Sequence, residues 1–303
     1  MNILVTGGAG FIGKYLVKYL VENGKNVSIL DNFSNSDKKS ISSFENKGVK
    51  VFEGDITNFD NVLNATKDQD VVIHLAAKIS VIESIKNPSE TFQINVDGTK
   101  NILTICKKNN VKKLIIASSA AVYGEGDKEN KITEEDKINP LSPYGESKMK
   151  MEEEVIKNYS DIKTKYVILR FFNIYGIGQT SEYAGVITKF LEKIKKNQPL
   201  SISGDGTQIR DFVSIYDIIC SINNAIEHNK NGIFNIASGN GITINELARL
   251  MISLSGKKLD IQNVPFKQGE IKYSQASILL AKEKLGYISK INLKEGIKKL
   301  LKN

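Results

Sequence analysis

The chain has 303 residues, of which 41% are hydrophobic and 25% are charged, as is usual for a globular protein of one large or two unequal domains. Its formal net charge of +8 comes mainly from lysines spread over helical patterns, and no lysine-rich stretch is interleaved with aromatic residues. This argues against nucleic-acid binding. No apolar stretch is long enough to span a bilayer, and the chain enters a strand at its first residues. We therefore expect a cytoplasmic protein with neither a nucleic acid nor a membrane as its partner.

Cysteine and histidine are scarce, which limits metal chemistry. Cys106 and Cys220 both lie inside apolar helical patterns, and neither has metal-ligand spacing. The two histidines are His74, at the end of the apolar run "DVVIHL", and His228. We expect His74 to be a strand-end residue, the cysteines to belong to the core, and the chain to hold no metal.

Strands and helices alternate along the first half of the chain. "NILVT" at the start is β-rich and precedes a glycine turn and the helical pattern "FIGKYLVKYLVENG". The next strands are "NVSIL", which ends at Asp31, and "VKVFEGD", which ends at Asp55; "DVVIHLAA", "VKKLIIASSA" and "TKYVILRFF" follow. Continuous apolar strands alternating with helices predict an α/β fold with a doubly wound, Rossmann-type parallel sheet.

Beyond residue 173 the alternation becomes less regular. "AGVITKFLEKIKKNQ" and "TINELARLMISLSG" are helical, whereas "LSISG" and "GIFNIAS" are short strand patterns. No proline- or serine-rich linker separates the two halves, so we expect them to be packed together. We predict a first domain over 1–172 that also receives 208–236, and a smaller C-terminal α/β part, mainly over 173–303, that binds the substrate.

The turn after the first strand has the pattern of a dinucleotide-binding site. "TGGAGFIG" places Gly7, Gly10 and Gly13 between a strand and a helix, where the backbone can approach a pyrophosphate at the helix N-terminus. Asp31 ends the second strand, where an acid can bind the adenosine ribose hydroxyls and repel a 2′-phosphate. No arginine lies near Asp31. The pattern therefore predicts NAD rather than NADP.

The stretch "SPYGESK" places Tyr144 four residues before Lys148, so both lie on one face of a helix that Ser142 and Pro143 begin. A free tyrosine ionises near pH ~10 and is a poor base at neutral pH. The lysine ammonium and a nearby nicotinamide cation would favour the phenolate and lower that pKa. Ser119, at the end of the strand "VKKLIIASSA", could share the proton.

These and further pieces resemble the extended branch of the short-chain dehydrogenase/reductase superfamily over essentially the whole chain. The matching stretches are "TGGAGFIG", "DNFSNS", "GDI", "HLAA", "NVDGT", "SSAAVYG", "SPYGESK", "LRFFNIYG" and "RDFVSIYD". Within that branch the sequence is most similar to UDP-glucose 4-epimerases and related nucleotide-sugar 4-epimerases. By this resemblance Ser119, Tyr144 and Lys148 are the catalytic residues.

The resemblance also implies the residues of two binding sites. Those expected to bind NAD are Gly7, Gly10, Phe11, Ile12, Gly13, Asp31, Asn32, Asn35, Ser36, Asp55, Ile56, Leu75, Ala76, Ala77, Lys78, Asn95, Tyr144, Lys148 and Phe172. Those expected to bind the substrate are Ser119, Ala120, Ala121, Tyr144, Asn173, Ser201, Ser203, Arg210, Lys267 and Ser274.

The activity implied by the resemblance is redox-neutral. The enzyme would interconvert UDP-glucose and UDP-galactose through a transient 4-keto sugar and would retain tightly bound NAD. The N-acetylated pair is a further possible substrate, because Ser274 stands where a tyrosine restricts related enzymes to non-acetylated sugars. A one-residue shift of the alignment would place Tyr273 there instead. The family also implies a homodimer formed through a helix bundle.

Three alternatives remain open from the sequence. Sugar-nucleotide 4,6-dehydratases and related decarboxylases resemble this chain but need acids directly after the serine position, where Ala120 and Ala121 stand. The second alternative is a net sugar oxidoreductase that uses free NAD(P)H, and the third is a non-catalytic NAD-binding sensor.

The chain also departs from the family late in the sequence. "KQGE" at 267–270 replaces the usual Arg-x-Gly-Asp, so Lys267 offers a positive charge without the bidentate fork of an arginine. Which base the nucleotide carries is left open.

Overall fold

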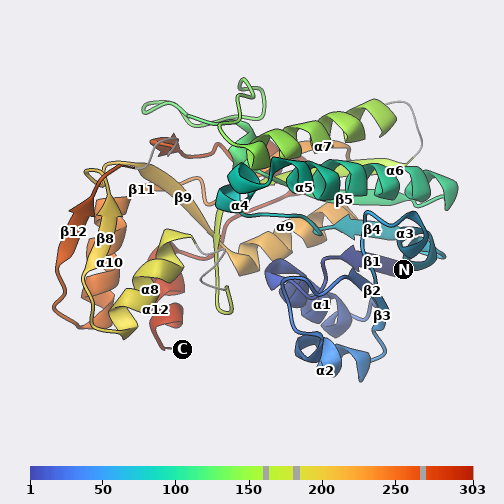
Figure 1. The fold of residues 1–303 in the computed structure, drawn as a ribbon, viewed down its shortest axis with the longest axis horizontal. Helices are drawn as coiled ribbons and strands as arrows, with labels where there is room; N and C mark the ends of the chain where they lie inside the picture. The colour runs from blue at the N-terminus through green and yellow to red at the C-terminus, as the bar shows by residue number, and fades with distance from the viewer. Residues whose placement is uncertain (160–163, 180–184, 267–270, 303) are drawn as a thin grey trace.

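The computed structural model describes residues 1–159, 164–179, 185–266 and 271–302, which form two unequal parts side by side along the long axis (Figure 1). The larger part holds a seven-stranded sheet in the order β10-β6-β5-β4-β1-β2-β3, and its neighbouring strands are all parallel. The strands are β1 (Asn2–Thr6), β2 (Asn26–Asp31), β3 (Lys50–Glu53), β4 (Val71–His74), β5 (Lys113–Ser119), β6 (Lys165–Phe171) and β10 (Gly232–Ile236).

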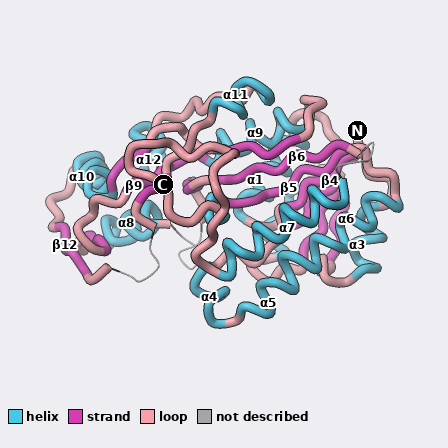
Figure 2. The backbone as a smooth tube through the Cα atoms, turned by 90° about the horizontal axis from the view of Figure 1, so that it is seen from above, coloured by secondary structure: helices cyan, strands magenta, loops and turns pink. Residues whose placement is uncertain are grey.

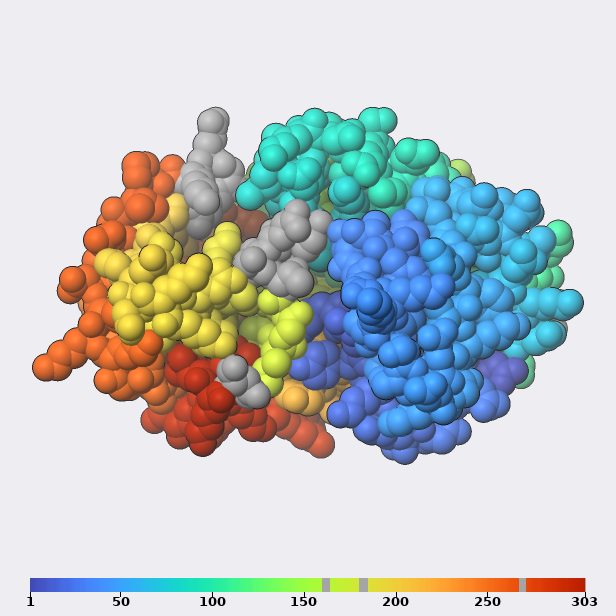
Figure 3. All heavy atoms as spheres, turned by 60° about the horizontal axis from the view of Figure 1, so that its bottom comes forward, coloured from blue at the N-terminus to red at the C-terminus, as the bar shows by residue number. Residues whose placement is uncertain are grey.

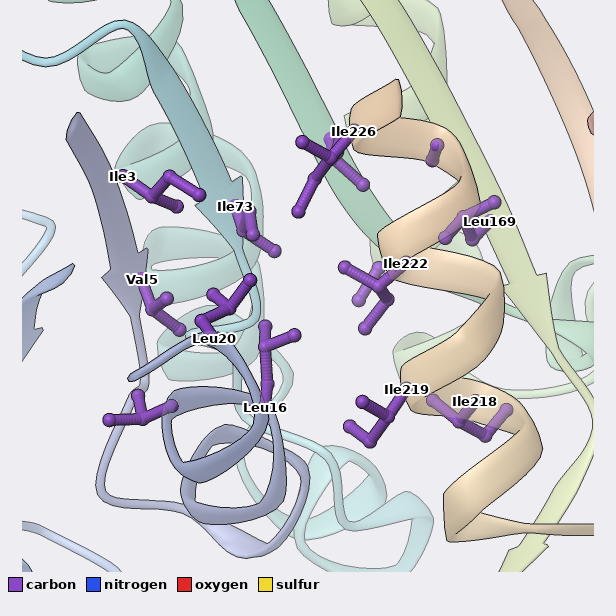
Figure 4. Packing of buried hydrophobic residues seen from close by; sticks show 14 of the residues in the cluster. Ile3, Val5, Leu16, Leu20, Ile73, Leu169, Ile218, Ile219, Ile222 and Ile226 are labelled. Carbon is purple, nitrogen blue, oxygen red and sulfur yellow. The ribbon is translucent and has the colours of Figure 1, made fainter. Parts of the chain in front are cut away.

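Each strand of this sheet sends alternate side chains to opposite faces, so two separate cores form. On one face, Ile3 and Val5 of β1 pack with Leu16 and Leu20, and the isoleucines of α9 complete the cluster (Figure 4). On the other face, Leu4 packs in a second cluster. The helices over the first face are α1 (Phe11–Glu22), α9 (Ile215–Glu227) and α11 (Leu279–Leu285); those over the second are α3 (Phe59–Thr66), α6 (Gly98–Lys108) and α7 (Pro143–Tyr159) (Figure 2). The predicted doubly wound parallel sheet is confirmed.

Short helical segments fill several of the connections between strands and helices. They are η1 (Lys38–Ile41), α2 (Ser42–Glu45), α4 (Val81–Lys86), α5 (Pro88–Phe92), the π-helical turn η2 (Gln93–Asp97) and η3 (Ala120–Val122). The π-helical turn runs directly into α6. Within the described ranges, every helix is too short or too polar to cross a lipid bilayer.

The smaller part is built on two small sheets and its own core. Strand β9 pairs in parallel with β7 and β13 and antiparallel with β11, and a separate pair joins β8 to β12. These strands are β7 (Asn173–Tyr175), β8 (Leu200–Ser203), β9 (Ile209–Ser214), β11 (Gly241–Thr243), β12 (Ile261–Val264) and β13 (Tyr273–Ser274). The helices α8 (Val186–Lys195), α10 (Ile244–Ser255) and α12 (Leu293–Lys302) share one apolar cluster with them.

The chain passes between the two parts more than once. Strand β9 belongs to the smaller part, but α9 and β10, which follow it, return to the larger sheet. Seen as spheres, the blue-to-cyan residues of the larger part and the yellow-to-red residues of the smaller part face each other across the molecule (Figure 3). The predicted domain boundary at residue 172, with 208–236 returned to the first domain, remains our proposal, although β9 at the start of that stretch pairs with strands of the smaller part.

Candidate active site

A cavity of about 630 Å³ lies at the carboxyl ends of the parallel strands and is lined from both parts of the chain. Ligands in doubly wound folds bind at this edge. Most of the predicted site residues lie in its wall: Gly7, Gly10, Phe11, Ile12, Gly13, Asp31, Asn32, Asn35, Ser36, Asp55, Ile56, Leu75, Ala76, Ala77, Lys78, Ser119, Tyr144, Lys148, Phe172 and Asn173.

The glycine turn forms a cradle that side chains would fill. Gly7 has φ +68°, and a Cβ there would lie 2.8 Å from the backbone nitrogen of Ala76. A Cβ on Gly13 would lie 2.6 Å from the Cα of Gly8. Gly10 begins helix α1 without a side-chain cap, and Phe11, in the first turn, lines the cavity. A backbone surface at a helix N-terminus suits a pyrophosphate.

Asp31 lies where the adenosine ribose of a dinucleotide is expected. Its Oδ2 accepts a hydrogen bond from the backbone nitrogen of Ala9 at 2.9 Å, and its Oδ1 accepts one from Phe33 at 2.9 Å. Each carboxylate oxygen can accept a further hydrogen bond. Asp31 can therefore bind a pair of ribose hydroxyls without moving, and the residues present fit NAD.

Asp55, at the end of the third strand, is held as a carboxylate. Burial by itself raises the pKa of this group, but hydrogen bonds from Thr57 and Asn32 lower it below the usual value. The Asn32 amide donates to Asp55 at 2.7 Å, and the Thr57 backbone and hydroxyl donate at 2.8 and 2.7 Å. This arrangement fixes Asn32 and Asp55, two polar side chains of the predicted NAD site that line the cavity.

Asn95 supports the cavity wall from behind; among the described residues it is not part of the lining. It is buried in the π-helical turn, where its Oδ1 accepts from the backbone nitrogen of Lys78 at 2.7 Å. Its Nδ2 donates to the carbonyl of Lys78 and to the Ser147 hydroxyl, each at 2.9 Å. Asn95 therefore joins the segment after β4 to the helix that carries Tyr144.

His74 is buried beneath this wall in a chain of hydrogen bonds. The Thr99 hydroxyl donates to the carbonyl of Asn95, so it can only accept from Nε2 of His74, 3.0 Å away. The proton therefore sits on Nε2, and Nδ1 accepts from the Thr6 hydroxyl at 2.7 Å. Burial and the nearby Lys148 cation lower the pKa of His74 to about 3. His74 ends β4, as predicted, and is a neutral structural group.

Ser119, Tyr144 and Lys148 meet at the cavity from two elements. Ser119 is the last residue of β5, and the other two lie one turn apart near the start of α7. The Ser142 hydroxyl accepts from the backbone nitrogen of Gly145 at 3.1 Å, which caps the helix as predicted. Lys148 donates to the carbonyl of Ala117 at 2.9 Å. The pattern "SPYGESK" thus places a phenol, an ammonium and a hydroxyl at one wall.

Burial changes the acidity of both groups on α7. It raises the pKa of Tyr144, and a hydrogen bond with Ser119 opposes that shift. It lowers the pKa of Lys148 to about 8, and the Glu152 carboxylate opposes that shift. The expected lowering of the Tyr144 pKa is therefore not a property of the chain alone, and it needs a positive charge beside the phenol.

Several residues predicted to bind substrate lie elsewhere. Ala120 and Ala121 form the turn after Ser119, whose hydroxyl accepts from the Ala121 nitrogen at 3.2 Å. Arg210 donates to backbone carbonyls of Ile209, Ile271 and Lys272. Among the described residues, those predicted for the substrate but absent from the wall of this cavity are Ala120, Ala121, Ser201, Ser203, Arg210 and Ser274. Lys267 lies outside the described residues.

Ser274 and Ser201 differ in exposure. Ser274 is 7% exposed and belongs to β13, which pairs with β9 at Arg210. Ser201 is exposed on β8.

No group of three metal-ligating side chains occurs in the part of the chain that the structure describes.

Sequence reasoning missed Glu90 and Glu152 near the site. Glu90 lines the cavity and forms an ion pair with Lys78 at 3.1 Å. Glu152 is buried with Arg170, with a nitrogen–oxygen distance of 2.6 Å. The available signal for Glu152 was its spacing, since it follows Lys148 by four residues and so shares its helix face. The sequence around Glu90 contains no pattern that would have predicted its place in the cavity wall.

Comparisons with known proteins agree with this geometry. The model of the NAD dependent epimerase/dehydratase family matches residues 3–237. A Methanocaldococcus jannaschii protein, named provisionally as a UDP-glucose 4-epimerase, is 41% identical over 99% of this chain and 97% of its own. The UDP-glucose 4-epimerase of Thermotoga maritima, solved with UDP-glucose, is 34% identical, with a TM-score of 0.94 over 100% of this chain and 98% of that one.

A third relative carries a different name. The UDP-N-acetylglucosamine 4-epimerase of Methanobrevibacter ruminantium, solved with UDP-N-acetylmuramic acid, is 32% identical, with a TM-score of 0.93 over 99% of this chain and 97% of that one. The resemblance seen in the sequence motifs is therefore confirmed. The chain belongs to the NAD dependent epimerase/dehydratase family, within the extended short-chain dehydrogenase/reductases, and its cofactor is NAD.

Proposed function

We propose that this nucleotide-sugar 4-epimerase relative interconverts UDP-glucose and UDP-galactose through a 4-keto sugar. The observation that carries the proposal is one cavity wall shared by the glycine cradle and by Ser119, Tyr144 and Lys148. A dinucleotide bound to that cradle and a sugar beside Tyr144 would therefore lie next to each other in one cavity. The names of the Methanocaldococcus and Thermotoga relatives support the choice of sugars.

Bound NAD would supply a nicotinamide that accepts a hydride from C4 of the sugar and later returns it. The residues of the chain handle the proton. The Tyr144 phenolate takes the proton of the 4-hydroxyl, and Ser119, which hydrogen-bonds the phenol, steadies the oxygen during the transfer. We assign Lys148, one turn away on the same helix face, as the cation that would favour the phenolate.

The nucleotide sugar is proposed to lie along the wall that the smaller part contributes. Asn173 and Gln179 offer amide groups there, and Ile187 and Phe212 offer apolar surface. Asn173 is itself held, since its amide donates to the carbonyl of Asp211 at 3.1 Å. A wall with few fixed charges would let the keto sugar rotate and present its other face.

The dehydratase and decarboxylase alternatives lack the acids that they need. Ala120 and Ala121 occupy the turn after Ser119, so this turn brings no carboxylate to the sugar. A binding protein without activity would have no use for a tyrosine and a buried lysine placed on one helix face at the cavity. We therefore favour the epimerase over a sensor.

The experiment that tests the proposal is an assay of purified protein without added cofactor. UDP-glucose, UDP-galactose, the two N-acetylated sugars and UDP-glucuronate are each supplied, and the products are separated by anion-exchange chromatography. We expect an equilibrium mixture of UDP-glucose and UDP-galactose. Strict dependence on added NADPH, with stoichiometric oxidation, would contradict the proposal.

Two further expectations accompany it. Acceptance of the N-acetylated pair stays a prediction, and the same assay with Ser274→Tyr tests it. An unchanged preference between acetylated and non-acetylated sugars would show that Ser274 is not part of the sugar site.

The family resemblance also favours a homodimer. Light scattering on the purified protein would measure its mass directly, and a monomer at micromolar concentration would contradict that expectation.

A further inference from the structure

A buried cluster of charged side chains lies directly behind the candidate catalytic residues. Arg170 of β6 and Glu152 of α7 form an ion pair at 2.6 Å, and both side chains are 2% exposed. The Arg170 Nε also donates to both carboxylate oxygens, at 3.0 and 3.2 Å. The hydroxyl of Ser118 donates to the same carboxylate. Such a pair costs desolvation free energy and is weak evidence for a stabilising role.

The cluster is fixed from several elements. Arg170 donates to the Tyr123 hydroxyl at 2.7 Å, and its guanidinium lies 4.7 Å from the centre of the Tyr123 ring. Tyr123 in turn donates to the Asn235 side chain at 2.7 Å. Strands β5, β6 and β10 thereby hold the Glu152 carboxylate in one place. Its position is set by neighbours on three strands as well as by its own helix.

The cluster adjoins the catalytic residues along two elements, β5 and α7. Ser118, which binds Glu152, is the residue before Ser119 on β5. Glu152 follows Lys148 by one helical turn, and Lys148 follows Tyr144 by one, so the three lie on one face of α7. Lys148 is itself only 4% exposed. A buried ammonium needs a nearby negative charge to remain protonated.

We propose that Glu152 is a positioning residue that keeps Lys148 protonated during turnover, with Arg170 and Ser118 holding its carboxylate at the required place. The role rests on the proposed function, in which the Lys148 cation favours the Tyr144 phenolate. In this arrangement the carboxylate acts through Lys148 and never touches the sugar.

The other charged and titratable groups around Lys148 do not take over this role. They are Tyr144 on the same helix, His74 on β4, Arg170 beyond Glu152, and the Lys78–Glu90 ion pair at the cavity wall. His74 is neutral, and the carboxylate whose charge acts on Lys148 is that of Glu152 rather than that of Glu90. Burial lowers the pKa of Lys148 to about 8, and Glu152 is the carboxylate that opposes this shift. Without it, the remaining Arg170 charge would repel the ammonium.

The test follows the titration of Lys148 itself. The ¹³Cε signals of labelled lysine are recorded against pH in NAD-saturated protein without substrate, with Lys148→Arg as the assignment blank. In Glu152→Gln we expect the Lys148 midpoint to fall by at least about one pH unit, a tenfold change in the protonation equilibrium. Glu153→Gln, an exposed acid on the same helix, is the control and should leave the midpoint unchanged.

A second variant guards against misfolding, because Glu152→Gln leaves Arg170 buried without its partner. Glu152→Gln/Arg170→Met removes both charges, and we expect the Lys148 midpoint below that of the wild type and above that of the single variant. An unchanged midpoint in either folded variant would overturn the proposal. A wild-type Lys148 that is already neutral at the pH of maximal turnover would also overturn it.

Turnover gives an independent readout. An active site that needs protonated Lys148 loses activity as pH rises through the Lys148 pKa, so the alkaline limb of the kcat/KM profile should move to lower pH in Glu152→Gln. A purely structural role would lower activity equally at all pH values, and that result would count against the proposal. The lysine titration needs no substrate, so failure of the proposed sugar assay and failure of this inference are distinguishable.

Discussion

The two walls of the cavity are built differently. On the side of the seven-stranded sheet, the backbone forms the surface: Gly7 has a positive φ, Gly13 has no room for a Cβ, and Asp31 is held by two backbone nitrogens. On the side of the smaller part, side chains form the surface, with Asn173 and Ile187 among them. A side-chain substitution therefore changes the surface of the wall from the smaller part, whereas the backbone surface of the sheet wall stays largely the same.

This difference parallels a contrast between the cofactor named for the family and the sugars named for its members. The family is described as NAD dependent, whereas the two solved relatives carry the names of UDP-glucose and UDP-N-acetylglucosamine 4-epimerases. We infer that the sheet wall fixes the cofactor and that the wall of the smaller part tunes the choice of sugar. The predictions below test that division.

The largest effect is expected at Tyr144, which lines the cavity from α7. Tyr144→Phe removes the hydroxyl that moves the proton, so turnover should fall by ~100- to ~10,000-fold with little change in substrate or NAD binding. Steady-state kinetics and calorimetry measure the two effects. Tyr166→Phe, on β6, is the control, because Tyr166 is not among the residues that line the cavity in the described ranges. Near-normal turnover in Tyr144→Phe would show that another group is the base.

A pair of glycine substitutions compares the walls directly. Gly13→Ala places a methyl group 2.6 Å from the Cα of Gly8, and such overpacking should weaken NAD binding by about tenfold to a hundredfold. Gly185→Ala, on the opposite wall, meets nothing within 4 Å and should leave NAD binding unchanged. The NAD content of each purified variant gives the measurement. Equal losses of bound NAD in both variants would mean that the sheet wall is not the one that determines NAD binding.

His74 tests the support beneath the sheet wall through pH. Burial lowers its pKa to about 3 from 6.5, so the unfolded chain binds a proton that the native chain does not bind between those values. As pH falls through that window, the unfolding free energy should drop by an extra ~1.4 kcal/mol per pH unit. Urea unfolding at several pH values should show a shallower dependence in His74→Gln. Parallel curves for wild type and variant would refute a neutral buried His74.

The smallest effect is expected at Ser201. This residue was predicted to bind the nucleotide, but it is exposed on β8 and is not in the described wall of the cavity. Ser201→Ala should therefore change the KM for the UDP-sugar by less than about twofold, whereas Asn173→Ala should raise it by about tenfold. Initial rates over a range of UDP-sugar concentrations decide the matter, and a larger effect at Ser201 would place the substrate farther into the smaller part.

Local patterns predicted the fold and most of the residues that line the cavity on the side of the large sheet, because strand ends and glycine turns determine where Gly7, Asp31 and Tyr144 lie. His74 and Glu152 gained their roles from partners distant in sequence, such as Thr6 and Arg170, which no local pattern reveals. Several residues of the smaller part that were predicted for the substrate do not line the cavity in the described ranges, for a related reason. The pairing of β13 with β9 and of β12 with β8 joins segments about sixty residues apart and sets which side chains reach the cavity.

The central claim is that a hydride leaves C4 of the sugar and returns to it inside one cavity. It is tested most directly with UDP-galactose that carries deuterium at C4, incubated with purified protein without added cofactor and followed by proton NMR. The account predicts UDP-glucose that retains the deuterium at C4. Product in which C4 has exchanged with solvent hydrogen, or no product from protein that retains its NAD, would contradict it.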